Sequence, residues 1–259
     1  MRNILWVMAF LFILPSVAFS AVRTEKIEYA LEEKVFEGFV AFDDAIEGKR
    51  PGVIVIHDWM GFGANQDHKR AMMLAELGYI ALSVDIYGKG VRPQNTEEAS
   101  AQATKFKNDR ALLRKHVLAG LDTLKNHPLT DGSRLAAIGY CFGGTTALEL
   151  ARSGAAVNGV VSFHGGLNAP VSEDAKNIKA KVLVLHGADD PFVPLEEIQS
   201  FKKEMNDAGV DWQMVYYSGA VHSFTEPQAG NDNSKGAAYN ANADKRSWEA
   251  MKVFFKEIF

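Results

Sequence analysis

The sequence contains one cysteine, Cys141, among its 259 residues. A lone cysteine excludes a disulfide within the chain, so the thiol either pairs with another chain or remains free. A metal-ligand pattern is also missing, because the seven histidines are not spaced as zinc ligands and no second cysteine completes such a set. We therefore expect no metal site.

An excess of basic residues is absent as well. The formal net charge is -4, which lacks the basic footprint of nucleic-acid binding. No Gly-x-Gly-x-x-Gly motif follows a predicted strand, and Gly61-Phe-Gly63 is better explained as a turn than as a nucleotide site. We expect no cofactor. The composition, 47% hydrophobic and 23% charged, is typical of one large globular domain without repeats or linkers.

The N-terminal apolar run is short for a membrane span. Ile4–Val17 follows a positively charged start and precedes the small residues Ala18 and Ser20, as in a secretory signal peptide. We expect a signal at residues 1–20, cleavage after Ser20, and one mature domain at 21–259 without a stable membrane span. This predicts export to the periplasm or the medium. An uncleaved N-terminal anchor is the alternative.

Strands and helices are predicted to alternate along most of the chain. Thr24–Asp43 alternates apolar and polar residues, which predicts an antiparallel hairpin at the sheet edge. Apolar runs predict further strands at 53–56, 79–84, 135–138, 157–163, 182–186 and 212–217. Helical patterns include 65–76 with Asn65 as its cap, 96–125 with a break, 195–206, and 243–258. The alternation predicts an α/β fold, with a mainly parallel sheet covered by helices on both faces.

The most informative stretch surrounds Cys141. The strand-like Leu135–Ile138 precedes it, a helical pattern follows, and the spacing Gly139-x-Cys141-x-Gly143 is typical of a nucleophile elbow. Such a strained turn requires neighbours without side chains. The dipole of the following helix lowers a thiol's pKa, and the Phe142 amide would face a developing oxyanion. A buried structural cysteine is the alternative. Because an elbow thiol lies inside a pocket, we expect it to be free and reactive.

An acid and a base follow in the order that an α/β-hydrolase requires. Asp189 and Asp190 lie in a loop after one predicted strand, and His222 follows the next. Nucleophile, acid and base then occur as Cys141, Asp190 and His222. Asp189 is the rival for the acid and is expected to cap the loop. His164 and His186 follow strands and are expected to make structural hydrogen bonds.

Four motifs together resemble the dienelactone hydrolase family. They are Gly139-Tyr-Cys-Phe-Gly-Gly144, His186-Gly-Ala-Asp-Asp-Pro-Phe-Val-Pro194, His222-Ser-Phe224 and Ala243-Asp-Lys-Arg-Ser-Trp248. The resemblance implies an α/β-hydrolase fold with a Cys-His-Asp triad of Cys141, His222 and Asp190.

The resemblance also implies roles for residues after an early strand. In the family, a glutamate there hydrogen-bonds the resting thiol, and the matching residue here is Asp58, one carbon shorter. The Trp59 amide would join that of Phe142 in the oxyanion hole. His57 either shapes the pocket or satisfies backbone carbonyls.

Two arginines hold the substrate carboxylate in the dienelactone enzymes. One follows a motif present here as Asp85-Ile-Tyr87, and its place is taken by Lys89, which is cationic but not a planar fork. The other corresponds to Glu226, whose charge is wrong for a carboxylate ligand. The resemblance thus implies ester or lactone cleavage with a changed acid-binding pocket that includes Tyr87 and Lys89.

The sequence therefore predicts an exported hydrolase that cleaves small esters or lactones through an acyl-thioenzyme. It does not define the oligomeric state, for which a monomer is favoured. An exported small-molecule-binding or interaction protein on the same scaffold is the alternative, since a fold alone does not define a function. A hydrolase of peptide or thioester bonds is a third possibility.

Overall fold

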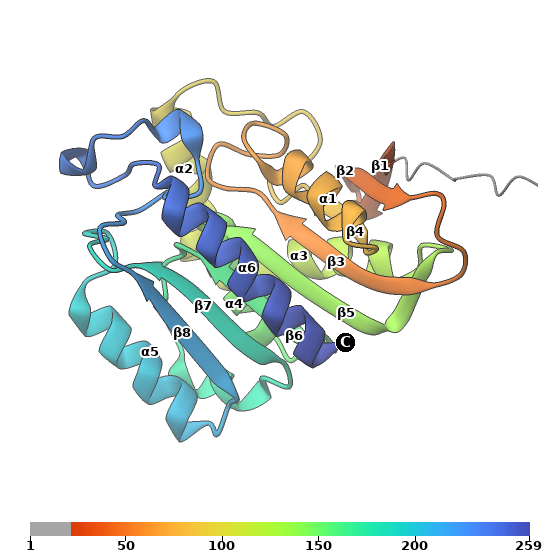
Figure 1. The fold of residues 1–259 in the computed structure, drawn as a ribbon. Coiled ribbons are helices and arrows are strands. Elements are labelled where there is room, and N and C mark those ends of the chain that lie inside the picture. Colours follow the sequence, from red (N-terminus) through yellow and green to blue (C-terminus); the bar gives the residue numbers. More distant parts are fainter. Residues whose placement is uncertain (1–21) are drawn as a thin grey trace, which may run out of the picture.

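The computed structural model describes residues 22–259, and the predicted signal segment lies outside these residues. Within them, eight strands form one sheet in the order β1-β2-β4-β3-β5-β6-β7-β8 (Figure 1). The strands are β1 Val22–Leu31, β2 Lys34–Asp43, β3 Arg50–Ile56, β4 Ile80–Val84, β5 Thr130–Tyr140, β6 Gly159–Phe163, β7 Lys181–Gly187 and β8 Trp212–Tyr217. β1 pairs antiparallel with β2, and β2 with β4, whereas all other neighbouring pairs are parallel.

The predicted fold class is confirmed. Every residue of β4 and of β6 is buried, as expected for parallel strands that are covered on both faces. The N-terminal hairpin forms the edge of the sheet and adds the expected antiparallel strands.

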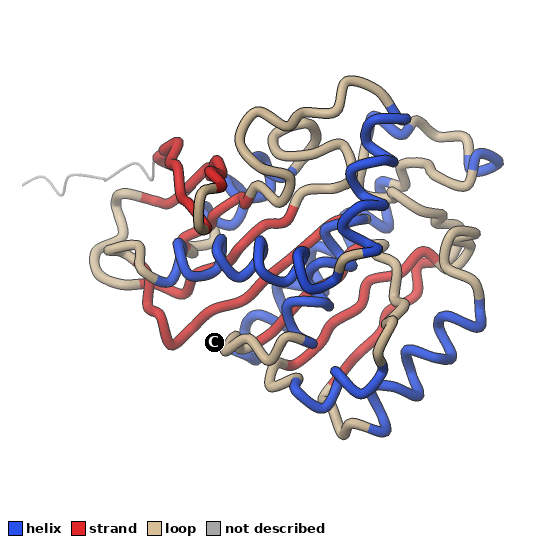
Figure 2. Tube along the Cα trace, turned by 180° about the vertical axis from the view of Figure 1, so that it is seen from behind, coloured by secondary structure: helices blue, strands red, loops and turns tan. Residues whose placement is uncertain are grey.

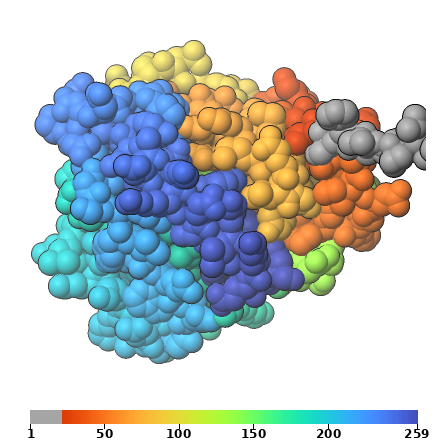
Figure 3. Space-filling model, in the orientation of Figure 1, coloured from red at the N-terminus to blue at the C-terminus, as the bar shows by residue number. Residues whose placement is uncertain are grey.

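Helices cover both faces of the sheet. They are α1 Asp67–Glu76, α2 Thr96–Asn108, α3 Arg110–Lys125, α4 Phe142–Arg152, α5 Leu195–Asp207 and α6 Ala241–Ile258. Apolar residues of α1 and α6 share one buried cluster with the sheet, and those of α2 to α5 share another. Figure 1 shows α1 and α6 in front of the sheet, and Figure 2 shows the fold from behind. The space-filling view has the same orientation as Figure 1 and shows α6, in dark blue, exposed across the middle of this face (Figure 3).

Two details of the helices bear on the predictions. The break in 96–125 occurs at Asp109, whose side chain accepts a hydrogen bond from the N–H of Leu112 and caps α3. The predicted cap at Asn65 is wrong, since α1 begins at Asp67 after Gln66. The Asn65 amide instead donates to the Asp58 carboxylate, because a buried carboxylate needs donors.

Within residues 22–259, no helix combines the length and the apolar character needed to cross a membrane.

Candidate active site

Cys141 lies in a tight turn between β5 and α4, with φ 53° and ψ -113°. This conformation is strained for a residue with a side chain. The neighbouring glycines are required by space, because a Cβ on Gly139 would lie 1.9 Å from the Gly143 carbonyl oxygen. A Cβ on Gly143 would lie 2.3 Å from the Ile56 oxygen. The turn holds the thiol at the carboxyl end of the parallel strands and at the N-terminus of α4, where ligands of open α/β sheets bind.

The structure brings Cys141, His222 and Asp190 into one line of hydrogen bonds. His222 Nε2 lies 3.1 Å from Cys141 Sγ, and His222 Nδ1 lies 2.9 Å from Asp190 Oδ2. Asp190 Oδ1 accepts a further bond of 2.9 Å from the N–H of Phe192. Asp189 instead accepts a bond of 3.1 Å from the Gly219 N–H at the surface, as its expected capping role requires.

The electrostatics of His222 follow from these contacts. Burial by itself would lower its pKa, but attraction to negative charge on Cys141 and the bond to Asp190 outweigh burial and raise the pKa to about 10. The imidazole therefore keeps its second proton above neutral pH, beside the sulfur.

Phe142 and Trp59 line the same cavity as Cys141, and their backbone N–H groups are the candidate oxyanion donors. Phe142 is the first residue of α4, so its N–H has no acceptor within the helix. The carbonyl of Trp59 accepts a hydrogen bond of 2.9 Å from the hydroxyl of Tyr87, which fixes the loop that carries it.

A cavity of about 450 Å³ opens over these groups. Its lining consists of Trp59, Lys107, Cys141, Phe142, Thr145, Gly166, Phe192, Val193, His222, Ser223 and Ala237. The thiol, the imidazole and both oxyanion candidates thus share one largely apolar space of a size that suits a small molecule. The lining also includes a cation that was not predicted from the sequence, Lys107 in the last turn of α2. No local motif marks this residue, because only the tertiary fold brings the end of α2 to the cavity.

Lys89 occupies a different position from the one predicted. Its ammonium pairs with Glu28 of β1 at 2.5 Å, and it is not part of the lining of the cavity over Cys141. The reason is a backbone bond of 2.9 Å from the Lys89 N–H to the Val35 carbonyl, which attaches this segment to the N-terminal hairpin.

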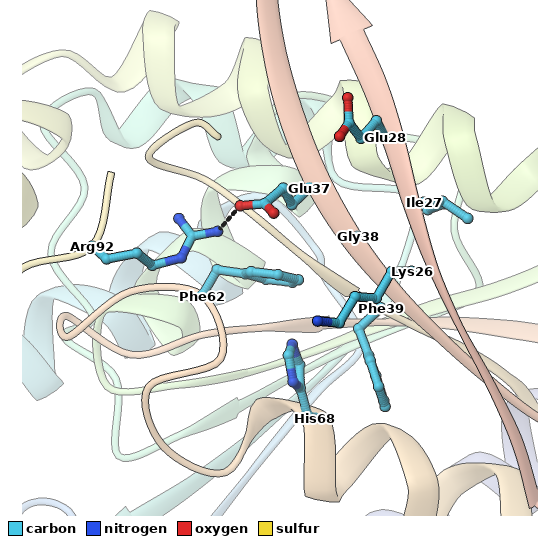
Figure 4. Close-up of a pocket in the computed structure, with 9 residues that line it drawn as sticks. All are labelled: Lys26, Ile27, Glu28, Glu37, Gly38, Phe39, Phe62, His68 and Arg92. Carbon is cyan, nitrogen blue, oxygen red and sulfur yellow. Dashed lines mark hydrogen bonds and ion pairs between the residues drawn. The ribbon is translucent and has the colours of Figure 1, made fainter. Parts of the chain in front are cut away.

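Glu28 lines a second cavity, of about 350 Å³, between the hairpin and the loop before α1 (Figure 4). Arg92 pairs with Glu37 on one side of it, and the side chains of Lys26 and His68 approach each other on another. The two cavities share no lining residue, and the second one is lined by Glu28, the ion-pair partner of Lys89.

Asp58 directs its carboxylate to its own loop. One oxygen accepts a bond of 2.8 Å from the Met60 N–H, and the other accepts from the Asn65 amide, while the hydrogen-bond partner of the Cys141 sulfur is His222. Burial raises the pKa of Asp58. With a side chain one carbon shorter than glutamate, Asp58 orders the loop of Trp59 without pairing with the thiol.

His57 and Tyr87 stabilise the loop that contains Asp58 and Trp59. His57 Nδ1 donates to the Asp58 carbonyl at 2.6 Å, and Nε2 accepts from the Ile86 N–H at 3.1 Å. Both ring nitrogens of His57 therefore form hydrogen bonds with the backbone, which agrees with the second of the two roles considered for this residue. Tyr87 is buried against the His57 ring, with centroids 4.8 Å apart, and burial raises the pKa of its hydroxyl.

Glu226 is buried and is not part of the cavity lining. It accepts hydrogen bonds from Gln228 Nε2 at 3.0 Å and from the Thr225 hydroxyl at 3.4 Å. Burial, together with repulsion from Asp58, raises the pKa of Glu226 to about 7. It is therefore a support beside the site, and it does not face a substrate carboxylate.

Residues 22–259 contain no group of three or more His, Cys, Asp or Glu residues placed to hold a metal ion.

The sheet order, the turn at Cys141 and the helices on both faces define an α/β-hydrolase. The chain matches the dienelactone hydrolase family over residues 36–259 and belongs to that family. It is accordingly an ester or lactone hydrolase.

Two solved structures are similar over nearly their whole length. The structure named m3DLH is 43% identical and covers 92% of this chain and 99% of its own, with a TM-score of 0.88. A dienelactone hydrolase-like promiscuous phosphotriesterase from metagenomic libraries is 41% identical, with the same coverage and TM-score. A Bradyrhizobium sp. protein, named as a probable 2-oxo-3-(5-oxofuran-2-ylidene)propanoate lactonase, is 31% identical over 191 residues, which are 70% of this chain and 76% of that protein.

Proposed function

We propose that this hydrolase cleaves small esters or lactones through a covalent thioester on Cys141. The observation that carries the proposal is the line of hydrogen bonds from Cys141 Sγ through His222 to buried Asp190, at 3.1 Å and 2.9 Å, with Cys141 and His222 in the lining of one cavity. Nucleophile, base and orienting acid need this mutual reach.

In the first half-reaction, the thiolate of Cys141 attacks the carbonyl carbon and forms a C–S bond. The carbonyl electrons move to oxygen, where the N–H groups of Phe142 and Trp59 stabilise the charge. Collapse breaks the C–O bond, and the leaving alkoxide takes the proton of the His222 imidazolium. Asp190 remains ionised and holds the imidazole in the required orientation.

In the second half-reaction, neutral His222 removes a proton from water, which attacks the thioester carbonyl. The tetrahedral intermediate collapses, the C–S bond breaks, and the carboxylic acid leaves. The thiolate and the imidazolium are then restored, so the cycle needs no other co-reactant.

The cavity suggests the kind of substrate. The cavity has a volume of about 450 Å³, and its lining includes the apolar side chains of Phe192 and Val193 and one ammonium, that of Lys107. We propose short esters or lactones that carry an anionic group as the best substrates. The similarity to a promiscuous phosphotriesterase supports phosphotriester cleavage as a second candidate activity of the same thiol.

We also propose that residues 1–20 direct export and are removed. The support is the charged start followed by the apolar run Ile4–Val17 and small residues at the cleavage position. Fractionation of cells that express the full chain, with N-terminal sequencing of the recovered protein, tests this. Recovery of the intact chain with the cell membranes would favour an uncleaved anchor.

Turnover of an ester panel tests the proposed chemistry. The panel contains short-chain aryl esters, dienelactone and an aryl phosphotriester, and the proteins compared are the wild type, Cys141→Ala and Cys141→Ser. We expect wild-type turnover and trapping of an acylated Cys141, and no turnover by Cys141→Ala. Turnover that survives in Cys141→Ala refutes the mechanism, and inactivity of all three proteins would favour a binding protein.

A further inference from the structure

A second histidine, His164, contacts both Cys141 and His222. His164 follows β6 and is fully buried, and its backbone has φ 39°, which is uncommon for a residue with a side chain. It is not part of the cavity lining, so it does not meet a substrate. Its ring nevertheless contacts the segments that carry Cys141 and His222.

The hydrogen bonds of His164 define its tautomer. The Cys141 N–H donates to His164 Nδ1 at 3.2 Å, in addition to the Phe163 carbonyl at 3.0 Å, so Nδ1 carries no proton. The proton is on Nε2, which donates to the Thr225 hydroxyl oxygen at 2.7 Å. The Thr225 hydroxyl then donates to Glu226 at 3.4 Å. All donors along this chain point away from Cys141.

The same ring supports the catalytic imidazole. The rings of His164 and His222 meet edge to face, with centroids 5.3 Å apart and an interplanar angle of 66°. Phe224 packs against His164 in the same manner, at 5.0 Å and 81°. Thr225, His222 and Phe224 belong to one short segment, and His164 therefore fixes that segment relative to the turn at Cys141.

The surroundings keep the His164 ring neutral. The titratable groups around it are His222, Arg70, His186, Tyr140 and Glu226. Burial, followed by repulsion from His222, lowers the pKa of His164 well below its usual value. A neutral ring can continue to accept the Cys141 N–H while His222 carries its second proton.

We infer that His164 is a positioning residue, which sets the reach between Cys141 Sγ and His222 through its bonds to the Cys141 N–H and the Thr225 hydroxyl. The inference rests on the proposed thiol chemistry. Small misplacements of reacting groups are costly, and a shift of about 1 Å can reduce a rate by about a hundredfold. Removal of the hydroxyl that anchors His164 should therefore reduce kcat and leave KM unchanged.

The test compares Thr225→Val, which has the same shape but no hydroxyl, with Thr225→Ser, which keeps the hydroxyl. The readouts are kcat and KM for an aryl ester, and the pH profile of Cys141 alkylation by iodoacetamide. We expect Thr225→Val to lose about tenfold in kcat, with KM within about twofold, and to need a higher pH for alkylation. Thr225→Ser should remain close to wild type in both readouts.

A second variant keeps the inference testable if Thr225→Val fails to fold. In His164→Asn, the new side chain tolerates positive φ but does not extend to Thr225, and it should show the same loss and the same alkylation shift. Circular dichroism identifies folded protein.

Wild-type kcat and alkylation in folded Thr225→Val, or equal losses in Thr225→Val and Thr225→Ser, overturn the inference. Alkylation needs no ester. If the wild type cleaves no ester, the proposed function fails, while the alkylation profiles still decide the role of His164.

Discussion

Replacement of Asp190 by Asn tests the assignment of the acid and gives a magnitude from the structure. The Asp190 side chain has no exposed surface, and it accepts bonds of 2.9 Å from His222 Nδ1 and of 2.9 Å from the Phe192 N–H. An asparagine has the same shape and can keep the second bond. It removes the negative charge that balances the imidazolium of His222.

Breaking a buried ion pair costs about 3–5 kcal/mol, and 1.36 kcal/mol corresponds to about tenfold in rate. The His222 side chain retains 12% exposure, so we use the lower part of this range. We expect kcat/KM to fall about a hundredfold to a thousandfold. The variant also removes one of the contacts that raise the pKa of His222, so the imidazolium beside the sulfur is less stable. Alkylation of Cys141 should therefore need a higher pH.

The matched control is Asp189→Asn, which changes a neighbouring carboxylate that bonds the Gly219 N–H at the surface. It should retain activity within about threefold, as exposed contacts contribute little. Steady-state kinetics on one aryl ester across the pH range, with alkylation rates from the same samples, check both variants. Near-normal activity in Asp190→Asn together with a large loss in Asp189→Asn would refute the reasoning and reverse the assignment.

Three further predictions follow from the same geometry. Gly143→Ala should destabilise the fold by about 2 kcal/mol or more in denaturant unfolding, since its Cβ would meet the Ile56 oxygen at 2.3 Å; unchanged stability would contradict this. Lys107→Met should raise KM for a carboxylate-bearing ester and leave KM for a neutral ester unchanged. The control Lys89→Met should leave both KM values unchanged. In the wild type, the raised pKa of folded Glu226 stabilises the fold below the pKa of the unfolded state, about 4.5, and this contribution is lost as the pH rises through about 7. The free energy of unfolding should therefore fall between about pH 4.5 and pH 7, and Glu226→Gln should flatten this fall. Parallel pH profiles of the two proteins would argue against this.

Local signals explain why the nucleophile turn could be predicted from the sequence. Two glycines, a cysteine and the change from an apolar run to a helical pattern occur within a few residues, and the steric need for Gly139 and Gly143 is met by backbone atoms nearby. The order of Asp190 and His222 could be predicted as well, since both follow strands whose carboxyl ends meet at one edge of a parallel sheet.

Other positions depend on contacts between distant segments, which the sequence pattern does not encode. Lys89 was expected in the substrate cavity, but a backbone bond to Val35 attaches it to the hairpin. Lys107 enters the cavity lining only because α2 packs over it. Asn65 has the sequence context of a helix cap, but the buried carboxylate of Asp58 uses its amide. In each case a tertiary contact outweighs a local preference.

Strained backbone conformations are concentrated at the site because of the topology of the fold. Four residues other than glycine have positive φ within residues 22–259, and three of them, Cys141, His164 and Ser223, belong to the candidate site or adjoin it. Each lies just after a strand or in the loop beyond it, where the chain must turn sharply to hold a side chain over the sheet edge. Such conformations cost of order 1–3 kcal/mol each. The packed sheet and helices must offset this cost, so the geometry of the thiol and the imidazole depends on the whole fold and not on the loops alone.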